Sequence, residues 1–220
     1  MELVRSPGVY RAGGFLYTPN LLPGTRVYGE ELRTEGEIEY RRFDPDRSKL
    51  AAWVQNGGRT WPFQRVQRVL YLGASHGTTV SHVSDILPRA HIYAVEKSPR
   101  AFAGLLNLAR ARDNVFPILA DAQLPERYRA RAGDVDLIYQ DLAQRNQTSI
   151  LVENARACLK PHGFALLQLK TRSVTQTRSP RAVLQGATDE LERDGFRVRE
   201  VVDLAPFSRD HFGLALQWET

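Results

Sequence analysis

The sequence is poor in sulfur-containing residues and in long apolar runs. It contains one cysteine, Cys158, and one methionine among 220 residues. A single cysteine excludes an intrachain disulfide and suits a reducing compartment. No apolar run approaches the roughly 20 residues that a helix needs to cross a bilayer, and the first residues, MELVRSPGVY, lack the apolar core of a signal peptide. We therefore expect a soluble, cytoplasmic protein that does not enter a membrane.

Lysine is also scarce. Of the 30 Lys and Arg residues, only Lys49, Lys97, Lys160 and Lys170 are lysines. A lysine can give up its proton when its pKa is depressed, whereas an arginine cannot, so the positions of these few lysines are informative about chemistry. The formal net charge of +5 favours a polyanionic partner.

The chain lacks the G-x-G-x-x-G pattern of dinucleotide-binding turns, but it has a glycine turn within Arg68–Thr79, RVLYLGASHGTT. An apolar run, Val69–Leu72, ends at Gly73, and Thr78 and Thr79 open a helical pattern. This order predicts a buried strand, a turn and a helix start. Glycines at such a turn let a nucleotide-like ligand approach the backbone. Without a pyrophosphate-binding pattern, the turn disfavours NAD and favours a cofactor with ribose and adenine but no phosphates.

Residues 1–47 differ from the rest of the chain, because glycine and proline turn signals separate short segments of β-forming residues. In the last of these segments, alternation puts Ile38, Tyr40 and Arg42 on one face and Glu39, Arg41 and Phe43 on the other. We expect a small antiparallel β subdomain that packs against the remainder, since it is too small to bury a core alone. It could dock a partner, edge the substrate groove or act as a structural cap. The expected strands are Val9–Arg11, Phe15–Thr18, Arg26–Tyr28 and Glu37–Phe43.

Residues 48–220 form the second expected domain, in which strands and helices alternate. It opens with a helix through about Gln55, capped by Ser48 or Asp46. Alternation of this kind predicts an α/β fold with a doubly wound, mostly parallel sheet of seven strands. The last two strands have no helix between them, so they should form an antiparallel hairpin, as in S-adenosylmethionine-dependent methyltransferases. The expected strands are Val69–Leu72, His91–Val95, Val115–Leu119, Val135–Tyr139, Phe164–Leu169, Arg197–Leu204 and Phe212–Trp218, and the expected helices are Thr79–Leu87, Pro99–Arg112, Thr148–Cys158 and Arg181–Asp194, with Ser98 as N-cap before Pro99.

Polar side chains follow successive strands at the end where a ligand crevice should lie. Glu96 follows the second core strand, and its carboxylate can accept hydrogen bonds from two ribose hydroxyls. Asp121 and Ala122 follow the third strand and could face an adenine edge, and Asp141 follows the fourth. Each acid alone could be an ordinary loop residue, but their recurrence at strand ends predicts a nucleoside site.

Lys170 ends the fifth strand and should project into the same crevice as Asp141. A partly desolvated lysine beside an acid can hold a hydroxyl nucleophile or accept its proton. The following loop, Thr171–Pro180, is polar and basic and suits phosphate contacts, although it could be merely solvated. Further candidates are His211, which could face the site or be structural, and a basic cluster of Arg127, Arg129 and Arg131.

With these residues placed, the chain resembles the fibrillarin family, in the compact archaeal form without a Gly/Arg-rich amino-terminal extension. The resemblance covers about residues 26–220. It rests on these motifs: VYGEEL (Val27–Leu32), EYR…RSKLA (Glu39–Ala51), VLYLGA…GTTVSHVSD (Val69–Asp85), YAVEKSPR (Tyr93–Arg100), ADA (Ala120–Ala122), DLAQ..QT (Asp141–Thr148), KTRS..T from Lys170, and RDH (Arg209–His211). The combination of GTTVSHVSD with DLAQ..QT is highly specific.

The resemblance implies an rRNA/tRNA 2′-O-methyltransferase that uses S-adenosylmethionine, yields S-adenosylhomocysteine and needs no metal. It would act in a C/D-box particle with a guide RNA, a Nop-family scaffold protein and a kink-turn-binding protein, and guide pairing would select the target nucleotide. The implied catalytic residues are Lys49, Asp141, Lys170 and His211. The implied cofactor-binding residues are Gly73, Ala74, Thr78, Thr79, Glu96, Lys97, Asp121, Ala122, Asp141, Leu142, Ala143 and Gln144.

The sequence departs from the family pattern at three places. His76 replaces a small residue in the glycine turn and is expected beside the methionine part of the cofactor, where it could change cofactor affinity. Arg145-Asn146 stands where Pro-Asp is usual, and Thr175 stands where an acid is common. These two changes are expected to affect RNA or partner contacts. No departure removes an implied catalytic residue.

The expected reaction is in-line transfer of a methyl group to a ribose 2′-hydroxyl. The protein mainly has to align and polarise this hydroxyl, with Lys170 and Asp141 holding the 2′-oxygen and Lys49 and His211 in support. Two alternatives stay open. One is methylation of a protein glutamine, and the other is a non-catalytic subunit of an RNA particle, which His76 would favour.

Overall fold

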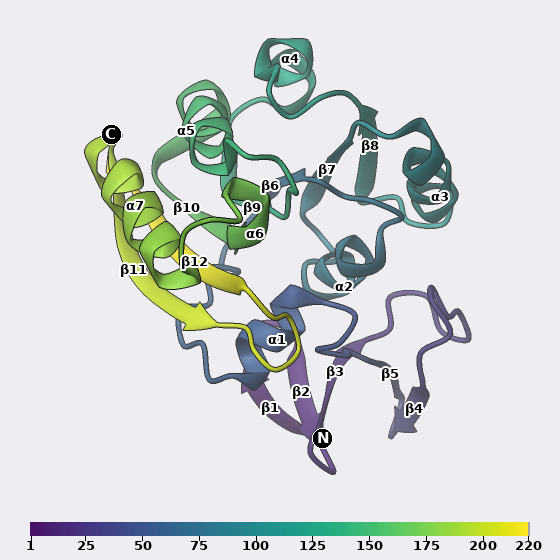
Figure 1. Ribbon diagram of the computed structural model, residues 1–220. Helices are drawn as coiled ribbons and strands as arrows, with labels where there is room; N and C mark the ends of the chain where they lie inside the picture. The colour runs from purple at the N-terminus through teal and green to yellow at the C-terminus, as the bar shows by residue number, and fades with distance from the viewer. Residues whose placement is uncertain (220) are drawn as a thin grey trace.

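The computed structural model describes residues 1–219, and the chain contains two β-sheets. The smaller sheet is antiparallel and is formed by the amino-terminal residues (Figure 1, purple). Its strand order is β1-β2-β3-β5-β4. The strands are β1 (Glu2–Arg5), β2 (Val9–Ala12), β3 (Phe15–Pro19), β4 (Leu32–Glu35) and β5 (Ile38–Arg42).

The larger sheet has seven strands in the order β11-β12-β10-β9-β6-β7-β8. Neighbouring strands from β10 to β8 are parallel, whereas β12 runs antiparallel to both β10 and β11. The expected α/β fold with a terminal antiparallel hairpin is therefore confirmed. The strands are β6 (Arg68–Leu72), β7 (His91–Glu96), β8 (Val115–Leu119), β9 (Val135–Gln140), β10 (Leu159–Lys170), β11 (Phe196–Asp203) and β12 (His211–Trp218).

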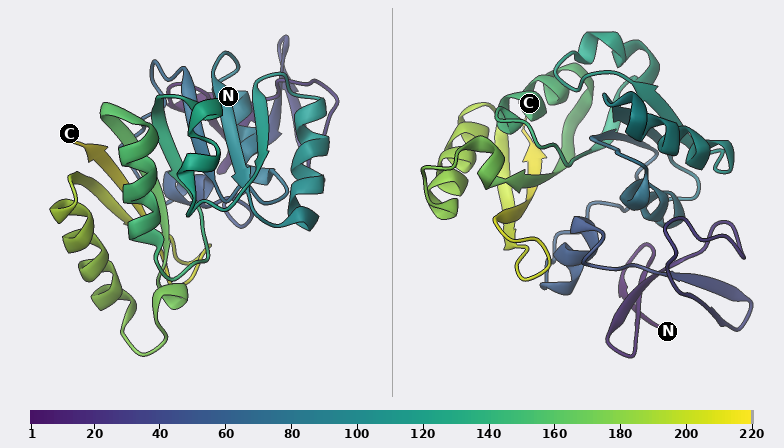
Figure 2. Two further views of the ribbon diagram at one scale, coloured as in Figure 1. Left: turned by 90° about the horizontal axis from the view of Figure 1, so that it is seen from above. Right: turned by 45° about the vertical axis from the view of Figure 1, so that its right-hand side comes forward.

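Helices cover both faces of the larger sheet, because its central strands are apolar on both sides. One core joins α1, α2, α3 and the smaller sheet to the face that carries Tyr71 and Tyr139. The other core joins α4, α5 and α7 to the face that carries Leu70 and Ile138. Figure 2 shows the helices on the two sides of this sheet. The helices are α1 (Lys49–Gln55), α2 (Thr78–Ile86), α3 (Pro99–Arg110), α4 (Arg129–Ala132), α5 (Gln147–Cys158), α6 (Thr171–Val174) and α7 (Pro180–Arg193), with a 3-10 turn, η1 (Pro125–Arg127).

A buried ion network fixes the smaller sheet to α2. Arg41 of β5 donates from Nε to Glu30 and from Nη1 to Asp85 of α2, each over 2.6 Å. Arg112 donates to the other Asp85 oxygen, also over 2.6 Å, and Arg41 and Asp85 are almost completely buried. Breaking a buried pair by removing one partner costs about 3–5 kcal/mol. The face of β5 that reads as polar in the sequence is thus a buried face.

Several local expectations are wrong. Residues Arg26–Tyr28 form no strand, since the backbone N–H groups of Val27 and Tyr28 bind the Glu30 carboxylate instead. Strands β1 and β4 and helices α4 and α6 were not expected, and β10 begins at Leu159 rather than Phe164. The expected N-cap at Ser98 is confirmed, because its side chain accepts from Ala101. Within residues 1–219, no helix combines the length and the apolar composition required to cross a bilayer.

Candidate active site

The turn after β6 approaches the loop after β9 closely. Gly73 has a φ of +82°, which favours glycine. A Cβ on Gly73 would lie 2.3 Å from the Asp141 carbonyl oxygen, so no side chain fits there. The N–H groups of Gly73 and Ala74 both donate to the Val95 carbonyl oxygen at 3.0 Å, which anchors the turn to β7. The strand ends of β6, β7 and β9 are thereby brought together.

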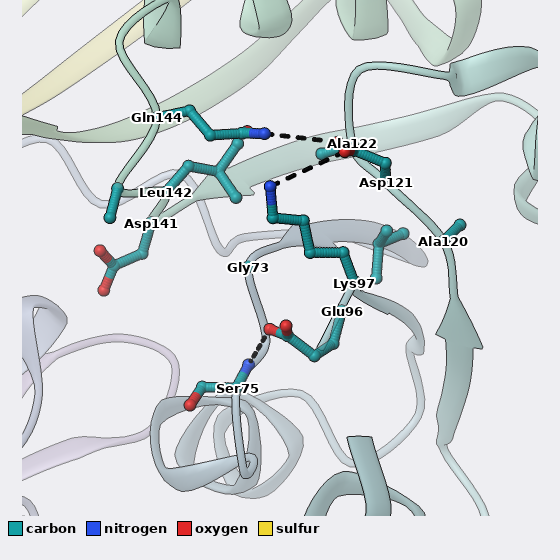
Figure 3. A pocket seen from close by; sticks show the side chains of 12 residues that line it. Gly73, Ser75, Glu96, Lys97, Ala120, Asp121, Ala122, Asp141, Leu142 and Gln144 are labelled. Atoms are coloured by element: carbon teal, nitrogen blue, oxygen red, sulfur yellow. Dashed lines mark hydrogen bonds and ion pairs between the residues drawn. The ribbon is translucent and has the colours of Figure 1, made fainter. Parts of the chain in front are cut away.

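These strand ends enclose a cavity of about 300 Å³ at the carboxyl edge of the larger sheet. Figure 3 shows its side chains, with Gly73 and Asp141 on one side and Ala120 on the other. The lining residues come from the ends of four parallel strands, β6 to β9. They are Gly73, Ser75, Val95, Glu96, Lys97, Ala120, Asp121, Ala122, Asp141, Leu142, Ala143 and Gln144.

Glu96 is held rigidly on the cavity wall. Its Oε2 accepts from the Ser75 N–H at 2.8 Å (Figure 3). Its Oε1 accepts from the Ser98 N–H at 2.7 Å. Each carboxylate oxygen can accept a second hydrogen bond. Glu96 therefore presents two oriented acceptor atoms to a ligand with neighbouring hydroxyl groups.

Asp121 lies at the opposite end of the cavity. Gln144 donates to its Oδ1 at 3.4 Å, and the Lys97 ammonium lies 3.7 Å from its Oδ2. Figure 3 shows both side chains directed at Asp121. Partial burial raises the pKa of Asp121, but the hydrogen bonds from Gln123 and Gln144 and the Lys97 charge outweigh it and lower that pKa. Asp121 thus stays an ionised hydrogen-bond acceptor.

Most residues implied as cofactor-binding line this cavity, from Gly73 and Glu96 to Gln144. Ala74, Thr78 and Thr79 do not line it. The Thr79 hydroxyl donates to the Ser48 hydroxyl at 3.0 Å, which ties the start of α2 to α1. The sequence reasoning missed Ser75, Val95 and Ala120, although all three adjoin residues that it identified.

His76 was expected beside the methionine part of the cofactor, and its side chain lies outside the cavity. Its ring lies against α3, where a Cβ on Gly104 would meet the His76 Cδ2 at 2.9 Å, and its Nδ1 lies 3.2 Å from the Ser75 hydroxyl. His76 is exposed and does not line the cavity. The left-handed conformation of Ser75, with a φ of +49°, lies directly before this ring. His76 therefore gives no support to a site without cofactor.

Lys49 and Asp141 form an ion pair next to the cavity. The Lys49 Nζ lies 2.8 Å from the Asp141 Oδ2, and each side chain is about one quarter exposed, at 23% and 24%. Lys49 is the first residue of α1, and Asp141 directly follows β9. Figure 3 shows the Asp141 carboxylate pointing away from Asp121. The pair therefore lies at the end of the cavity that is remote from Asp121.

Lys170 and His211 meet at the same edge because β10 and β12 are antiparallel. The last residue of β10, Lys170, is paired with the first residue of β12, His211. The His211 Nδ1 lies 2.7 Å from the Arg209 carbonyl oxygen. Since a carbonyl only accepts, Nδ1 carries a hydrogen, and Nε2 of the neutral ring keeps a free lone pair.

The electrostatic surroundings keep the His211 ring neutral. Burial lowers the pKa of His211, and the charges of Lys49 and Lys170 lower it further. The hydrogen bond to Arg209 and the charge of Asp141 act in the opposite direction but do not prevail. The four implied catalytic residues thus converge on one edge, with two ammonium groups, one carboxylate and one neutral imidazole.

Basic loops flank this edge. Arg172 pairs with Asp210 at 3.3 Å, and Thr171 donates from its N–H to the Asp210 carbonyl oxygen at 3.0 Å, which joins α6 to the loop before β12. Two of the three departures from the family pattern, Arg145-Asn146 and Thr175, come together in a cavity of about 250 Å³ between α5, α6 and α7. Arg145, Asn146, Thr175 and Arg178 are among its lining residues. The expected basic cluster of Arg127, Arg129 and Arg131 lies on η1 and α4, outside this cavity. The Arg129 Nε donates a hydrogen bond to the Ala157 carbonyl oxygen.

Comparison of the chain with known proteins identifies its family. The family model described as Fibrillarin matches residues 3–220. The chain belongs to the fibrillarin family. Fibrillarin membership accounts for the larger sheet with its terminal hairpin as well as for the amino-terminal sheet, because the solved fibrillarins match nearly the whole chain.

Three relatives define the comparison. The fibrillarin-like rRNA/tRNA 2′-O-methyltransferase of Sulfolobus acidocaldarius is 42% identical over 205 residues, which cover 93% of this chain and 89% of that protein. The crystal structure of Aeropyrum pernix fibrillarin with natively bound S-adenosyl-L-methionine matches with a TM-score of 0.85 at 40% identity, over 97% of this chain and 100% of that one. A fibrillarin/Nop5p complex matches with a TM-score of 0.88 at 40% identity, over 97% and 98% of the respective chains.

Proposed function

We propose that this fibrillarin-family chain is the catalytic subunit of a C/D-box ribonucleoprotein. In this role it transfers a methyl group from S-adenosylmethionine to ribose 2′-hydroxyls of rRNA, tRNA or both. The observation that carries the proposal is the convergence of Lys49, Asp141, Lys170 and His211 beside the cavity at the end of β6–β9. The naming of relatives as rRNA/tRNA 2′-O-methyltransferases supports the substrate class.

The cavity fits S-adenosylmethionine, which supplies an activated methyl group when bound. Glu96 offers two oriented acceptors for ribose hydroxyls, and Asp121 offers an ionised acceptor for the adenine amine. The close approach of Gly73 to the Asp141 carbonyl oxygen leaves no room for a side chain on this part of the cavity wall. No pyrophosphate-binding glycine pattern stands at the turn. The natively bound S-adenosyl-L-methionine of Aeropyrum pernix fibrillarin supports the same ligand.

The four polar side chains divide the work on the target hydroxyl. Lys170 and Asp141 hold the 2′-oxygen, the ammonium by donating and the carboxylate by accepting. Lys49 neutralises Asp141 over 2.8 Å and fixes its orientation. His211, kept neutral, presents a free Nε2 lone pair next to them. Alignment of the hydroxyl and polarisation of its proton are what the protein must contribute.

The partners follow from charge and from the family. Arg178 precedes α7 and Arg181 lies in the first turn of α7, where both suit phosphates of a guide–target duplex. A Nop-family scaffold is supported by the fibrillarin/Nop5p complex, and a kink-turn-binding protein would join through the particle. The chain would work in the cytoplasm, where a guide RNA, rather than the chain itself, selects the nucleotide.

The test is methyl transfer in a particle reconstituted with guide RNA, matched target RNA and both partner proteins. Lys170→Ala and Asp141→Ala should each abolish methylation and leave assembly intact. Lys160→Ala is the matched control, because Lys160 pairs with Asp136 at the other end of β9 and β10. Unchanged activity in both site variants would overturn the assignment. Activity that needs no guide RNA would favour a protein glutamine acceptor instead, and a wild-type chain that binds no S-adenosylmethionine in calorimetry would favour a non-catalytic subunit.

A further inference from the structure

The side-chain amide of Gln147 forms two hydrogen bonds with the Lys170 backbone. The amide Oε1 accepts from the Lys170 N–H at 2.9 Å, and the Nε2 donates to the Lys170 carbonyl oxygen at 3.0 Å. Gln147 is the first residue of α5 and is completely buried. Both polar groups of the Lys170 backbone are therefore satisfied by one side chain.

These two hydrogen bonds take the place of pairing with β9, which has ended before Lys170. The last paired residues of β9 and β10 are Gln140 and Leu167, so no strand accompanies β10 on this side as far as Lys170. A primary amide carries the same donor and acceptor as a peptide group. The Gln147 amide thus continues the β9 side of the ladder beyond its end. On the other side, β12 accompanies β10 up to Lys170, where His211 is its partner.

Gln147 also closes the loop that lines the cofactor cavity. The Gln140 Nε2 donates to the Gln147 carbonyl oxygen at 2.7 Å, which joins the residues on either side of the loop 141–146. Asp141 and Gln144 in this loop line the cavity. The main chain of Gln147 therefore holds the cofactor loop, whereas its side chain holds Lys170.

We propose that Gln147 is a positioning residue for methyl transfer, which acts by fixing the Lys170 backbone so that the lysine side chain leaves the sheet toward Asp141. This inference rests on the proposed function. Lysine has a long and flexible side chain, so the direction of its Cα–Cβ bond decides where the ammonium group can reach. Catalytic groups must be held within about 0.5 Å by supporting hydrogen bonds, and a displacement of about 1 Å can reduce a rate about 100-fold.

The experiment compares Gln147→Ala with the parent chain in the reconstituted particle, under single-turnover conditions and saturating S-adenosylmethionine. The alanine variant keeps the main-chain carbonyl that Gln140 binds and loses only the bonds to Lys170. We expect a rate about 10- to 100-fold lower, with the KM for S-adenosylmethionine within about twofold of the parent value. Asn114→Ala is the control, since Asn114 is also a buried amide, with 8% exposure, and it bonds to Ser84 and Leu87, away from the site. It should lose stability but keep the parent rate.

Gln147→Glu separates positioning from simple structural support. A protonated carboxyl group can donate to the Lys170 carbonyl oxygen and accept from its N–H as the amide does, whereas an ionised one repels that carbonyl oxygen. Relative to the parent chain, this variant should therefore regain rate at mildly acidic pH and lose it at alkaline pH. The charged and titratable groups on the surrounding elements are Lys170 on β10, Asp141 after β9, Lys49 on α1, His211 on β12, Arg145 before α5, Arg178 before α7 and Glu190 on α7.

The outcomes are distinct. A Gln147→Ala rate within threefold of the parent rate, or a Gln147→Glu rate that follows the parent rate at every pH, overturns the role of Gln147 and leaves the proposed function standing. An Asn114→Ala rate as low as that of Gln147→Ala overturns it as well, because general destabilisation then explains both. A parent chain that is inactive on guide-matched RNA overturns the proposed function, and the role of Gln147 falls with it.

Discussion

Replacing Gly73 with alanine would disturb the turn after β6 in two ways. The φ of +82° at Gly73 costs an L-residue about 1–2 kcal/mol. The added Cβ would also lie 2.3 Å from the Asp141 carbonyl oxygen, about 1 Å short of the 3.4 Å at which ordinary contact begins. The Asp141 backbone must retreat by about that amount, and a misplacement of about 1 Å near reacting groups costs on the order of 100-fold in rate. We therefore expect a moderate loss of stability and a large loss of activity.

Gly57→Ala separates these two effects. Gly57 has a similar φ of +86°, but no atom lies within 4 Å of a Cβ built there. Both variants should lose about 1–2 kcal/mol of unfolding free energy in urea titrations. Only Gly73→Ala should also bind S-adenosylmethionine more weakly in calorimetry and transfer methyl groups about 100-fold more slowly. Equal activity of the two variants would refute the steric reasoning.

Three further predictions concern the buried ion network and His211, the proposed catalytic histidine. Asp85→Ala leaves the Arg41 and Arg112 guanidinium groups buried without their carboxylate and should lower the unfolding free energy by about 3–5 kcal/mol; a loss below 1 kcal/mol would contradict this. The network crosses the predicted domain division after residue 47, so the parent chain should unfold in one transition, and two separate transitions in calorimetry would show independent units. The pKa of His211 is lowered from the ordinary histidine value of 6.5, so its ring stays neutral to lower pH than a free histidine. The contribution of His211 to the methylation rate should therefore be constant above this pH and decline only below it, whereas His211→Ala should lose this acid decline; a decline that begins above neutral pH would contradict the assignment.

The order of strands and helices could be predicted because the apolar periods are clear. The apolar run before Gly73 forms β6, whose side chains alternate between the two cores. The residues after the turn follow a helical period and form α2. Because parallel strands end at one edge, Glu96, Asp121 and Asp141 could be expected together, and they line one cavity. Lys170 could be expected at the same edge because β10 runs parallel to β9, although it does not line the cavity.

The amino-terminal sheet was harder to predict, because its residues do not follow a simple pattern of apolar inside and polar outside. Arg41 would be expected in solvent, yet it is completely buried, since Glu30 and Asp85 supply its hydrogen bonds. Those partners come from a loop and from another sheet's helix. The alternation of residues within β5 therefore does not show that Arg41 is buried.

Two site features depended on tertiary contacts. The position of His76 is decided by the open surface of Gly104 on α3, which lies far along the chain and accepts its ring. Gln147 directly precedes the expected helix start at Thr148, and its contact with Lys170 becomes visible only when β9 is seen to end early. A single sequence shows which residues are polar, but not which polar groups a neighbouring strand leaves without a partner.

The position of β12 has a consequence for the order of assembly. Among residues 1–219, this strand follows all the other strands in sequence, yet it lies between β10 and β11. As the chain is synthesised, β11 is complete before the strand that connects it to the sheet exists. Until residues 211–218 insert, the edge of β10 stays unpaired, and Lys170 lacks its neighbour His211. The pairing of Lys170 with His211 would thus form late in folding, so a nascent chain could carry a nearly complete cavity at the ends of β6–β9 before the proposed catalytic residues are together.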